Sequence, residues 1–453
     1  MGNAAPAGPS APSSLTTQQV HRRVWAIAFP AILANSSAPL VGLVDTWAVG
    51  HLPGAVHLAA VGLGSVIFNF LFWAFGFLRM GTTGLVAQAH GRGDRRELGR
   101  IVARSCALAL AFGVLLWVLQ EPIWRVSLAA LAPPEDVARI TSDYFDLRIW
   151  AAPASLLVFA ISGVLFGIGK TTAVLVLQVA LNLGNAVLNV WFVVGLDLGV
   201  PGVALGTVIA QWMAVLLGGW LLWNIPEIRD GLSVLSEKTT WALSAYRPLL
   251  VLNGFIFLRT ILLMIALTLI MREAAGLGET AMAASHVLNQ YLLLIALGLD
   301  GFAHAAEAQA GAAWGHGRRA EFQRWVRVSG IWAFVASVGY AALFWFAGEH
   351  ITAVLTDIET VRQAVAGVMP LVAALPVISV ACYHFDGVFI GATAAKAMLG
   401  TMAIAFVVYL LILGPMTERW GLAGLWGAVI VFMAIRGLTQ ALWYPRLLAR
   451  LPE

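Results

Sequence analysis

Long apolar runs separated by short polar segments dominate this chain. Each run reaches about 20 residues, the length that crosses a bilayer as a helix. They lack the apolar–polar alternation of a membrane β-barrel, so helices are the expected spanning structure. We therefore predict an all-α integral membrane protein with twelve transmembrane helices, near 24–50, 56–79, 98–119, 142–166, 172–195, 200–223, 246–270, 282–305, 328–347, 365–391, 397–416 and 422–443.

The two halves of the chain repeat one another. GRGDRREL (91–98) resembles GHGRRAEF (315–322), and GVLFGIG (163–169) resembles GVFIGAT (387–393), both at an offset of 224 residues. We predict two pseudo-symmetric six-helix lobes, 22–223 and 244–446, with a cytoplasmic linker at 224–243 and a disordered tail at 1–21. Parallel repeats are typical of transporters, with the binding site at the repeat interface. A duplication without mechanical meaning is the alternative.

Composition and charge favour the membrane over nucleic acid. Hydrophobic residues make up 60% of the chain and charged residues 11%, with a mean hydropathy of +0.85. The net charge of +4 could suit nucleic acid, but the Lys and Arg residues gather in alternate loops. That is the positive-inside pattern, and it predicts cytoplasmic termini. The two cysteines, Cys106 and Cys382, lie in apolar runs and predict neither a disulfide nor a metal site.

An aspartate, Asp45, lies near the end of the first apolar run. A charged side chain at mid-bilayer costs about 2.5–3.5 kcal/mol even on the most lenient scale. Pro30 lies in the same run and favours a bend, because proline removes a backbone hydrogen bond. Asp45 could therefore exchange a proton or a cation, or it could cap the helix or pair with an arginine.

Four amides lie on one face of the fifth predicted helix. Gln178, Asn182, Asn185 and Asn189 are spaced by 4, 3 and 4 residues, which is helical periodicity. They could line a hydrated cavity and hydrogen-bond Asp45. They could instead join helices, as amides do in membranes.

A second polar stripe lies on the eighth predicted helix, where Asp300, His304 and Glu307 are spaced i, i+4 and i+7. These groups could relay protons or attract a cation. The alternative is a salt bridge from the stripe to Arg259, with a similar pair between Asp386 and Arg436. We find no zinc-ligand spacing or nucleophile motif, and GIGKTT (167–172) lacks the glycine that a P-loop requires. We expect no enzyme activity and no cofactor.

Several longer motifs resemble the multidrug and toxic compound extrusion (MATE) family, and its DinF-like branch in particular. They are LVDTWAVGHL (43–52), FLRMGTTGLVAQAHGRGD (77–94), LGLDGFAHAAEAQAG (297–311) and DGVFIGAT (386–393). The resemblance runs from about residue 22 to 446. It implies two six-helix lobes around a central cavity and antiport of organic, often cationic and aromatic, compounds against a cation.

The resemblance also assigns residues. Pro30 and Asp45 match the bending proline and the coupling aspartate of the first helix, and Thr207 matches a threonine near the cation site. Asn185 matches the asparagine of an N-x-x-x-D motif that reads NAVLN here, so Asn189 replaces the acidic residue. The missing carboxylate favours H⁺ over Na⁺ as the coupling ion, because sodium prefers several compensating oxygens.

We therefore expect a monomeric multidrug antiporter of the bacterial cytoplasmic (inner) membrane that exchanges small organic substrates for protons. Asp45, Asn182, Asn185, Asn189 and Thr207 form the expected coupling site. Substrate or relay positions are Gln178, Arg259, Asp300, His304, Glu307 and Asp386. The alternatives are sodium coupling, a lipid-linked precursor flippase of the same superfamily, and a membrane enzyme or receptor.

Overall fold

A computed structural model describes residues 16–50 and 54–452 of the chain. For residues 38–41, 43–46 and 48 it describes the backbone only, so the side chain of Asp45 lies outside the description. Within the described ranges the chain is helical almost throughout and contains no strand. The helices are α1 (Thr17–Gly50), α2 (Ala55–Ala74), α3 (Phe77–Arg92), α4 (Arg95–Val118), α5 (Gln120–Leu131), α6 (Glu135–Arg148), α7 (Ala152–Gly167), α8 (Thr171–Val190), α9 (Gly199–Trp223), α10 (Pro226–Gly231), α11 (Leu243–Gly276), α12 (Glu279–Gly315), α13 (Arg319–Leu355), α14 (Glu359–Gly391) and α15 (Ala395–Leu448).

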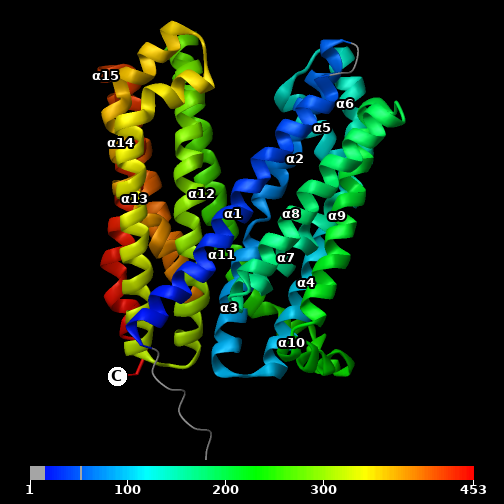
Figure 1. Cartoon of the computed structure of the whole chain (residues 1–453), viewed down its shortest axis with the longest axis vertical. Helices are drawn as coiled ribbons and strands as arrows, with labels where there is room; N and C mark the ends of the chain where they lie inside the picture. The colour runs from blue at the N-terminus through cyan, green and yellow to red at the C-terminus, as the bar shows by residue number, and fades with distance from the viewer. Residues whose placement is uncertain (1–15, 51–53, 453) are drawn as a thin grey trace, which may run out of the picture.

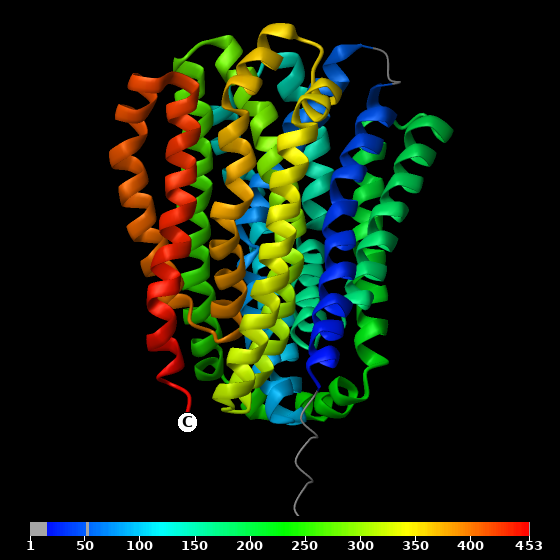
Figure 2. The ribbon, with the colours of Figure 1, turned by 60° about the vertical axis from the view of Figure 1, so that its left-hand side comes forward.

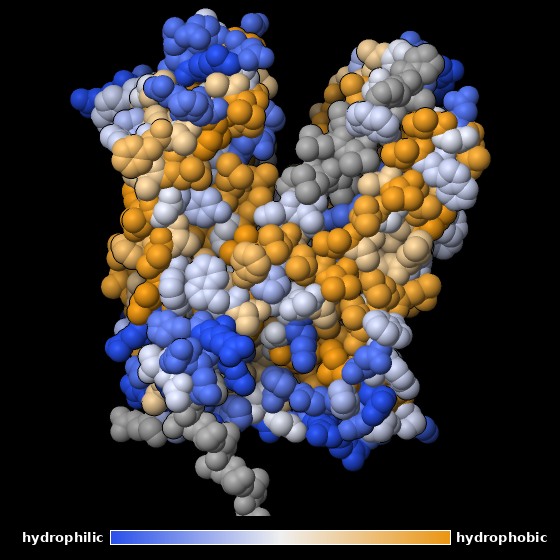
Figure 3. All heavy atoms as spheres, in the orientation of Figure 1, coloured by the Kyte–Doolittle hydropathy of each residue, from blue (hydrophilic) through white to orange (hydrophobic). Residues whose placement is uncertain are grey.

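The number of membrane spans agrees with the sequence prediction. Ten helical stretches of the searched ranges are long and apolar enough to cross a bilayer. One of them, α15, consists of two helices that meet at Gly421, where φ is 55°. Counting α15 twice and adding the 34-residue α1 gives twelve spans. The predicted all-α membrane fold is therefore confirmed. Figure 3 shows the matching surface, with an apolar band across the middle and hydrophilic residues at both ends.

The helices form two lobes that stand side by side. Figure 1 shows α2 to α9 in one group, here called the N-lobe, and α11 to α15 in the other, the C-lobe. Helix α1 runs obliquely between them, as the turned view in Figure 2 also shows. Both the start of α1 and the end of α15 lie at the lower end of the molecule, which we call the chain-end side.

Glycine contacts repeat between the two lobes at the offset of 224 residues. A Cβ at Gly163 would lie 2.6 Å from the carbonyl oxygen of Arg79, and Gly387 packs in the same way on the carbonyl of Ala303. Residues 387 and 303 follow residues 163 and 79 by 224 positions each. The same close approach of α3 to α7 is thus reproduced by α12 and α14, so the sequence repeat is a structural repeat.

The lobes touch along a seam between α3 and α12 on the chain-end side. Gly91 packs on the carbonyl of Ala312, and Gly315 packs reciprocally on the carbonyl of Gln88. At the centre of the seam a Cβ at Gly311 would lie only 2.7 Å from the Cβ of Ala87. Residue 311 is the repeat counterpart of residue 87, so the pseudo-two-fold axis passes between these two positions.

Further contacts close the chain-end side, whereas the opposite side is open. The Gln88 side chain donates from Nε2 to the carbonyl oxygen of Gly391 (2.9 Å) across the lobes. The Trp25 ring of α1 meets Trp332 and Phe302 of the C-lobe edge-on at 5.2 and 5.3 Å. Figure 3 shows the molecule hollowed between the lobes on the side away from the chain ends.

The segment between the lobes is a folded connector that binds α4. It comprises α10, two 3₁₀ turns (Leu232–Ser236 and Lys238–Thr240) and the residues between them. Glu237 accepts hydrogen bonds from Arg96 and Arg100, the latter at 3.1 Å, and Arg104 donates to the Thr240 carbonyl at 2.9 Å. Arginines on the first turns of α4 therefore fix the connector to the N-lobe.

Candidate functional site

A cavity of about 400 Å³ lies between the lobes, mostly within the C-lobe. Its wall combines leucines and aromatic rings with six charged side chains and one histidine. The charged residues and the histidine are Arg79, Arg259, Asp300, His304, Glu307, Asp386 and Arg436. Helices α11, α12, α14 and α15 supply most of the wall, and Trp73, Arg79 and Met80 come from the N-lobe.

Asp386 is the acceptor of a buried polar network in the C-lobe. Its Oδ2 oxygen accepts from the guanidinium groups of Arg259 and Arg436, the latter at 3.0 Å. Its Oδ1 oxygen accepts from Gln440 Nε2 at 2.6 Å. Both arginine side chains are only 5% exposed and Asp386 is 14% exposed. The predicted pair of Asp386 with Arg436 is confirmed, but the alternative that joined Arg259 to the Asp300 stripe is wrong, because Arg259 binds Asp386.

A second cluster joins the two lobes at the wall of the cavity. The Arg79 Nη1 nitrogen of α3 lies 3.4 Å from both the Glu307 Oε2 oxygen and the His304 Nδ1 nitrogen of α12. His304 Nδ1 lies 3.3 Å from the same Glu307 oxygen. Phe166 of α7 stacks on the His304 ring with centroids 4.2 Å apart and has the Arg79 guanidinium 5.4 Å from its own centroid. Glu307 is therefore neutralised by a cation from the opposite lobe.

Asp300 occupies a different environment on the same helix face. It lines the cavity one helical turn before His304, and its side chain is only partly buried. Among the described residues no side chain or backbone group makes a hydrogen bond or an ion pair with it. The stripe that the sequence predicts is therefore divided: His304 and Glu307 join Arg79, and Asp300 faces the cavity alone.

The amides of α8 bind the two helices on either side of it. Asn182 donates from Nδ2 to Ser37 Oγ of α1 (2.7 Å), and Asn185 donates from Nδ2 to Thr207 Oγ1 of α9 (2.9 Å). Asn189 donates to the Asn185 Oδ1 oxygen at 3.3 Å and is fully buried. These bonds give Asn182 and Asn185 the helix-joining role that the sequence left open, and they bring Thr207 into the same cluster.

Asp45 can be placed only by its backbone. Thr171 donates to the carbonyl of Ala26, and Asn182 donates to Ser37, both across 145 residues. Helices α1 and α8 therefore run parallel in constant register, which brings Asn189 level with the backbone of residues 44 and 45. The predicted bond between Asp45 and these amides lies outside the described side chains. Helix α1 continues without a break through Pro30.

One sequence prediction needs adjustment, and one cavity residue was not among the predicted site residues. Gln178 is not among the side chains that line the cavity, because α8 does not contribute to its wall. Arg79, by contrast, is central to the cavity, although its position within an apolar run was its only signal in the sequence. Its partner Glu307 lies 228 residues away, and no local spacing connects them.

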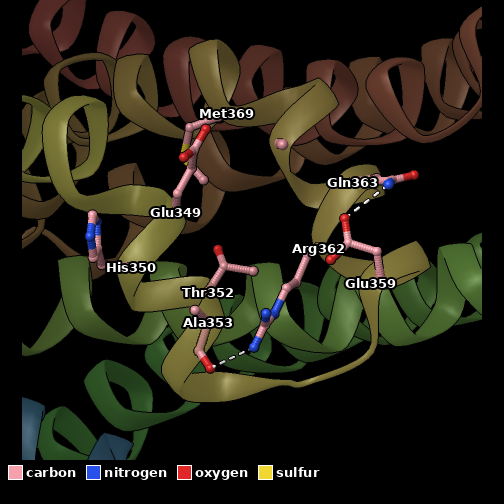
Figure 4. A pocket seen from close by; sticks show the side chains of 9 residues that line it. Glu349, His350, Thr352, Ala353, Glu359, Arg362, Gln363 and Met369 are labelled. Atoms are coloured by element: carbon pink, nitrogen blue, oxygen red, sulfur yellow. Dashed lines mark hydrogen bonds between the residues drawn. The ribbon is translucent and has the colours of Figure 1, made fainter.

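A second hollow, of about 460 Å³, lies between the end of α13 and the start of α14 (Figure 4). Arg362 donates to the carbonyl of Ala353 at 3.2 Å, and Gln363 donates to Glu359 at 2.9 Å. These groups satisfy one another across a surface turn. The hollow lies outside the cavity between the lobes and contains none of the predicted site residues.

The two repeated lobes and the cavity between them define a polytopic membrane transporter. Residues 30–191 and 256–416 match MatE, one match in each half, and the chain therefore belongs to the MatE family, as its motifs suggested. It is 39% identical over 428 residues to "DNA damage-inducible protein F" of Escherichia coli (strain K12), across 93% of this chain and 92% of that protein. It is 28% identical to "Protein DETOXIFICATION 44, chloroplastic" of Arabidopsis thaliana, across 94% and 82% of the two chains.

Solved structures share the fold. One is described as the outward-facing conformation of a multidrug resistance MATE family transporter of the MOP superfamily. It aligns with a TM-score of 0.86 and 18% identity, covering 95% of this chain and 96% of that one. At this identity the likeness concerns the fold and the arrangement of the lobes.

Proposed function

We propose that this protein is a proton-coupled antiporter that exports organic, cationic or amphipathic aromatic compounds. One observation carries the proposal. The lobes of a MatE-family transporter are closed by the α3–α12 seam on one side and enclose, next to it, a cavity with apolar walls and carboxylates. Such a site suits a ligand that has an aromatic body and a positive charge.

The orientation follows from charge. Arginines cluster on the chain-end side, and the positive-inside rule assigns that side to the cytoplasm. The cavity then faces outward, as in the solved relative that is described as outward-facing. We infer a monomer in the bacterial inner membrane with both termini cytoplasmic.

Asp45 is the proposed proton carrier of the N-lobe. The register of α1 and α8 supports this assignment, because it brings the buried Asn189 level with residues 44 and 45. An amide at residue 189, where the family motif has a carboxylate, leaves the surroundings of Asp45 with one negative charge fewer. Proton coupling is therefore favoured over sodium coupling, since a hard cation needs compensating charge.

A lipid-linked precursor flippase fits the cavity less well. Its substrate carries a pyrophosphate, which calls for cationic groups that are available for binding. The cavity arginines are already paired, Arg79 with Glu307 and both Arg259 and Arg436 with Asp386. Because these arginines are paired with carboxylates, the described cavity favours an organic cation.

Ethidium efflux from proteoliposomes tests the proposal. We expect an imposed pH gradient to drive efflux, a sodium gradient not to, and Asp45→Asn to abolish the pH-driven flux. Asp146→Asn serves as a matched control, because Asp146 is exposed on α6 and does not line the cavity. Efflux driven by sodium alone would overturn the choice of ion, and full efflux by Asp45→Asn would overturn the role of Asp45. If neither gradient moves ethidium, the multidrug function is wrong.

A further inference from the structure

The cavity has equal numbers of positive and negative side chains, but they are not paired one to one. Three guanidinium groups and three carboxyl groups line it. Two arginines share Asp386, and the third, Arg79, lies beside Glu307. Asp300 is the carboxyl group that remains without an ion-pair partner among the described residues.

An unpaired carboxylate is costly at this depth. Ionised groups removed from bulk water are stabilised by a counter-charge, by several hydrogen bonds or by a proton. The described neighbours make neither an ion pair nor a hydrogen bond with Asp300, and Arg79 and His304 act on it only at longer range. The cost falls when either a proton binds the carboxyl group or a cation enters the cavity.

We propose that Asp300 is the residue of the C-lobe that binds the positive charge of the substrate, and that it exchanges a proton for that charge. The inference rests on the proposed function and deepens it, because it adds a second exchange site to Asp45. When the cavity is empty, the Asp300 carboxyl group keeps its proton. When a monovalent organic cation binds, the O–H bond breaks, the proton leaves to the aqueous cavity, and the carboxylate pairs with the cation. The net charge of the site is the same before and after.

Other groups around Asp300 fit this division of roles. Asp386 and Glu307 repel a second negative charge nearby, whereas Arg79 and His304 attract it. The charged and titratable residues that face the cavity are His304 and Glu307 of α12, Arg79 of α3, Arg259 of α11, Asp386 and Tyr383 of α14, and Arg436 of α15. In the described part of the chain α1 and α13 contribute no charged residue to this wall.

The rest of the wall suits the body of such a ligand. Trp73 and Tyr383 offer aromatic rings, and Leu263, Leu267 and Leu292 offer apolar surface. Aromatic faces attract cations, and apolar walls remove the ligand's carbon surface from water. The volume of about 400 Å³ falls within the range of small-molecule sites, 300–1,000 Å³. A planar aromatic cation with a single charge is therefore the ligand class that the site selects.

Binding and proton release by the purified chain in detergent test the inference without requiring transport. The probes are ethidium and its uncharged parent ring system, phenanthridine, at neutral pH. We expect Asp300→Asn to weaken ethidium binding by about tenfold or more, as for the loss of one charge contact in a partly hydrated site. Phenanthridine binding should not change. Proton release per bound ethidium, measured in weak buffer, should fall by one in Asp300→Asn and should be retained in Asp300→Glu.

Asp146→Asn is the matched control, because Asp146 is an exposed aspartate of α6 that does not line the cavity. Thermal unfolding of each variant establishes that it is folded. Equal ethidium affinity and equal proton release in Asp300→Asn and wild type would overturn the inference, as would a wild-type chain that does not bind ethidium. Binding and proton release that depend on Asp300, in a chain that moves no dye in vesicles, would support the inference and contradict the proposed antiport.

Discussion

At the residue scale, the cavity contains two aspartates in opposite situations. Asp386 accepts from two arginines and a glutamine and is nearly buried, whereas Asp300 faces the cavity without a described partner. Both lie on long C-lobe helices, and both would read as intramembrane carboxylates in a sequence. The difference between them is in their partners and not in their depth: Asp386 is a structural charge, and Asp300 is available for binding.

The same substitution should therefore have different effects on stability at these two positions. Asp386→Asn leaves two buried guanidinium groups without their counter-charge, and breaking a buried pair in this way costs about 3–5 kcal/mol. Asp300→Asn removes no described interaction. We expect thermal unfolding in detergent to show a marked loss of stability for Asp386→Asn and little change for Asp300→Asn. Equal losses would mean that Asp300 has a structural partner as well.

At the element scale, the connector behaves as part of the N-lobe. Arg95 pairs with Asp230 at 2.7 Å, Arg100 pairs with Glu237 at 3.1 Å, and the backbone of Gly231 lies directly against Gly99 of α4. These contacts hold the connector from α10 to the second 3₁₀ turn. Trp241 still donates to the Leu235 carbonyl of the connector at 2.8 Å, so we expect the C-lobe to rotate relative to the N-lobe about the residues that follow, 242–243.

Glu237 gives this connector a measurable pH dependence. The hydrogen bond from Arg100, followed by the charge of Arg96, holds the pKa of the Glu237 carboxyl group below its ordinary value. A lowered folded-state pKa means that the pair stabilises the docked connector above the ordinary carboxyl pKa, and that this stabilisation is lost as the pH falls through the lowered one.

Hydrogen exchange of residues 232–240 measures this effect. Glu237→Gln should speed their exchange at pH 7. After correction for intrinsic rates, the difference from wild type should vanish as the pH falls through the lowered pKa. Glu321→Gln is the control, since Glu321 pairs with Arg318 in an exposed pair on the other lobe. A difference that persists at acid pH would show that the charge of Glu237 is not what holds the connector.

The elements themselves were largely predictable from sequence, but their partners were not. A span needs only an apolar run of sufficient length, and the polar breaks marked its ends. The choice of partner for Arg259 required the fold, because Asp386 lies 127 residues away and the Asp300 stripe was an equally plausible acceptor from spacing alone. The sequence correctly predicted that the amides of α8 lie on one face of the helix. Only the packed structure shows that Asn182 bonds to α1 and Asn185 to α9.

At the scale of the whole molecule, the seam between α3 and α12 closes one side of the transporter. Opening that side requires α3 and α12 to separate, so close packing at the seam sets the balance between the two states. Glycines allow backbones to approach where any side chain would push them apart. The contact between Ala87 and Gly311 lies at the centre of this seam.

Gly311→Ala should shift the molecule toward the state that opens on the chain-end side. The added Cβ would lie 2.7 Å from the Ala87 Cβ and 3.1 Å from the Gly391 Cα, and such overpacking costs about 1–3 kcal/mol. Spin labels at Arg92→Cys and His316→Cys, two exposed positions that the repeat makes equivalent, report the separation of the lobes. We expect a second, longer distance in Gly311→Ala.

The companion change Ala87→Gly should reverse most of this shift, because it removes the methyl group that the new Cβ meets. Gly339→Ala is the control, since nothing lies within 4 Å of a Cβ at that position of α13. An unchanged distance distribution in Gly311→Ala, or a double variant no closer to wild type than the single one, would show that this contact does not govern the opening.

The axis between Ala87 and Gly311 has a consequence for how two fused halves can differ from two identical subunits. In a symmetric dimer, a residue on the axis meets its own copy, so both sides must carry the same side chain. Two alanines at this spacing would overlap, and two glycines would leave a gap. A single chain that contains both halves can carry a methyl group on one side of the axis and none on the other. This chain does so with Ala87 and Gly311. Fusion thus permits a tighter fit on the axis than any homodimer of either half could reach.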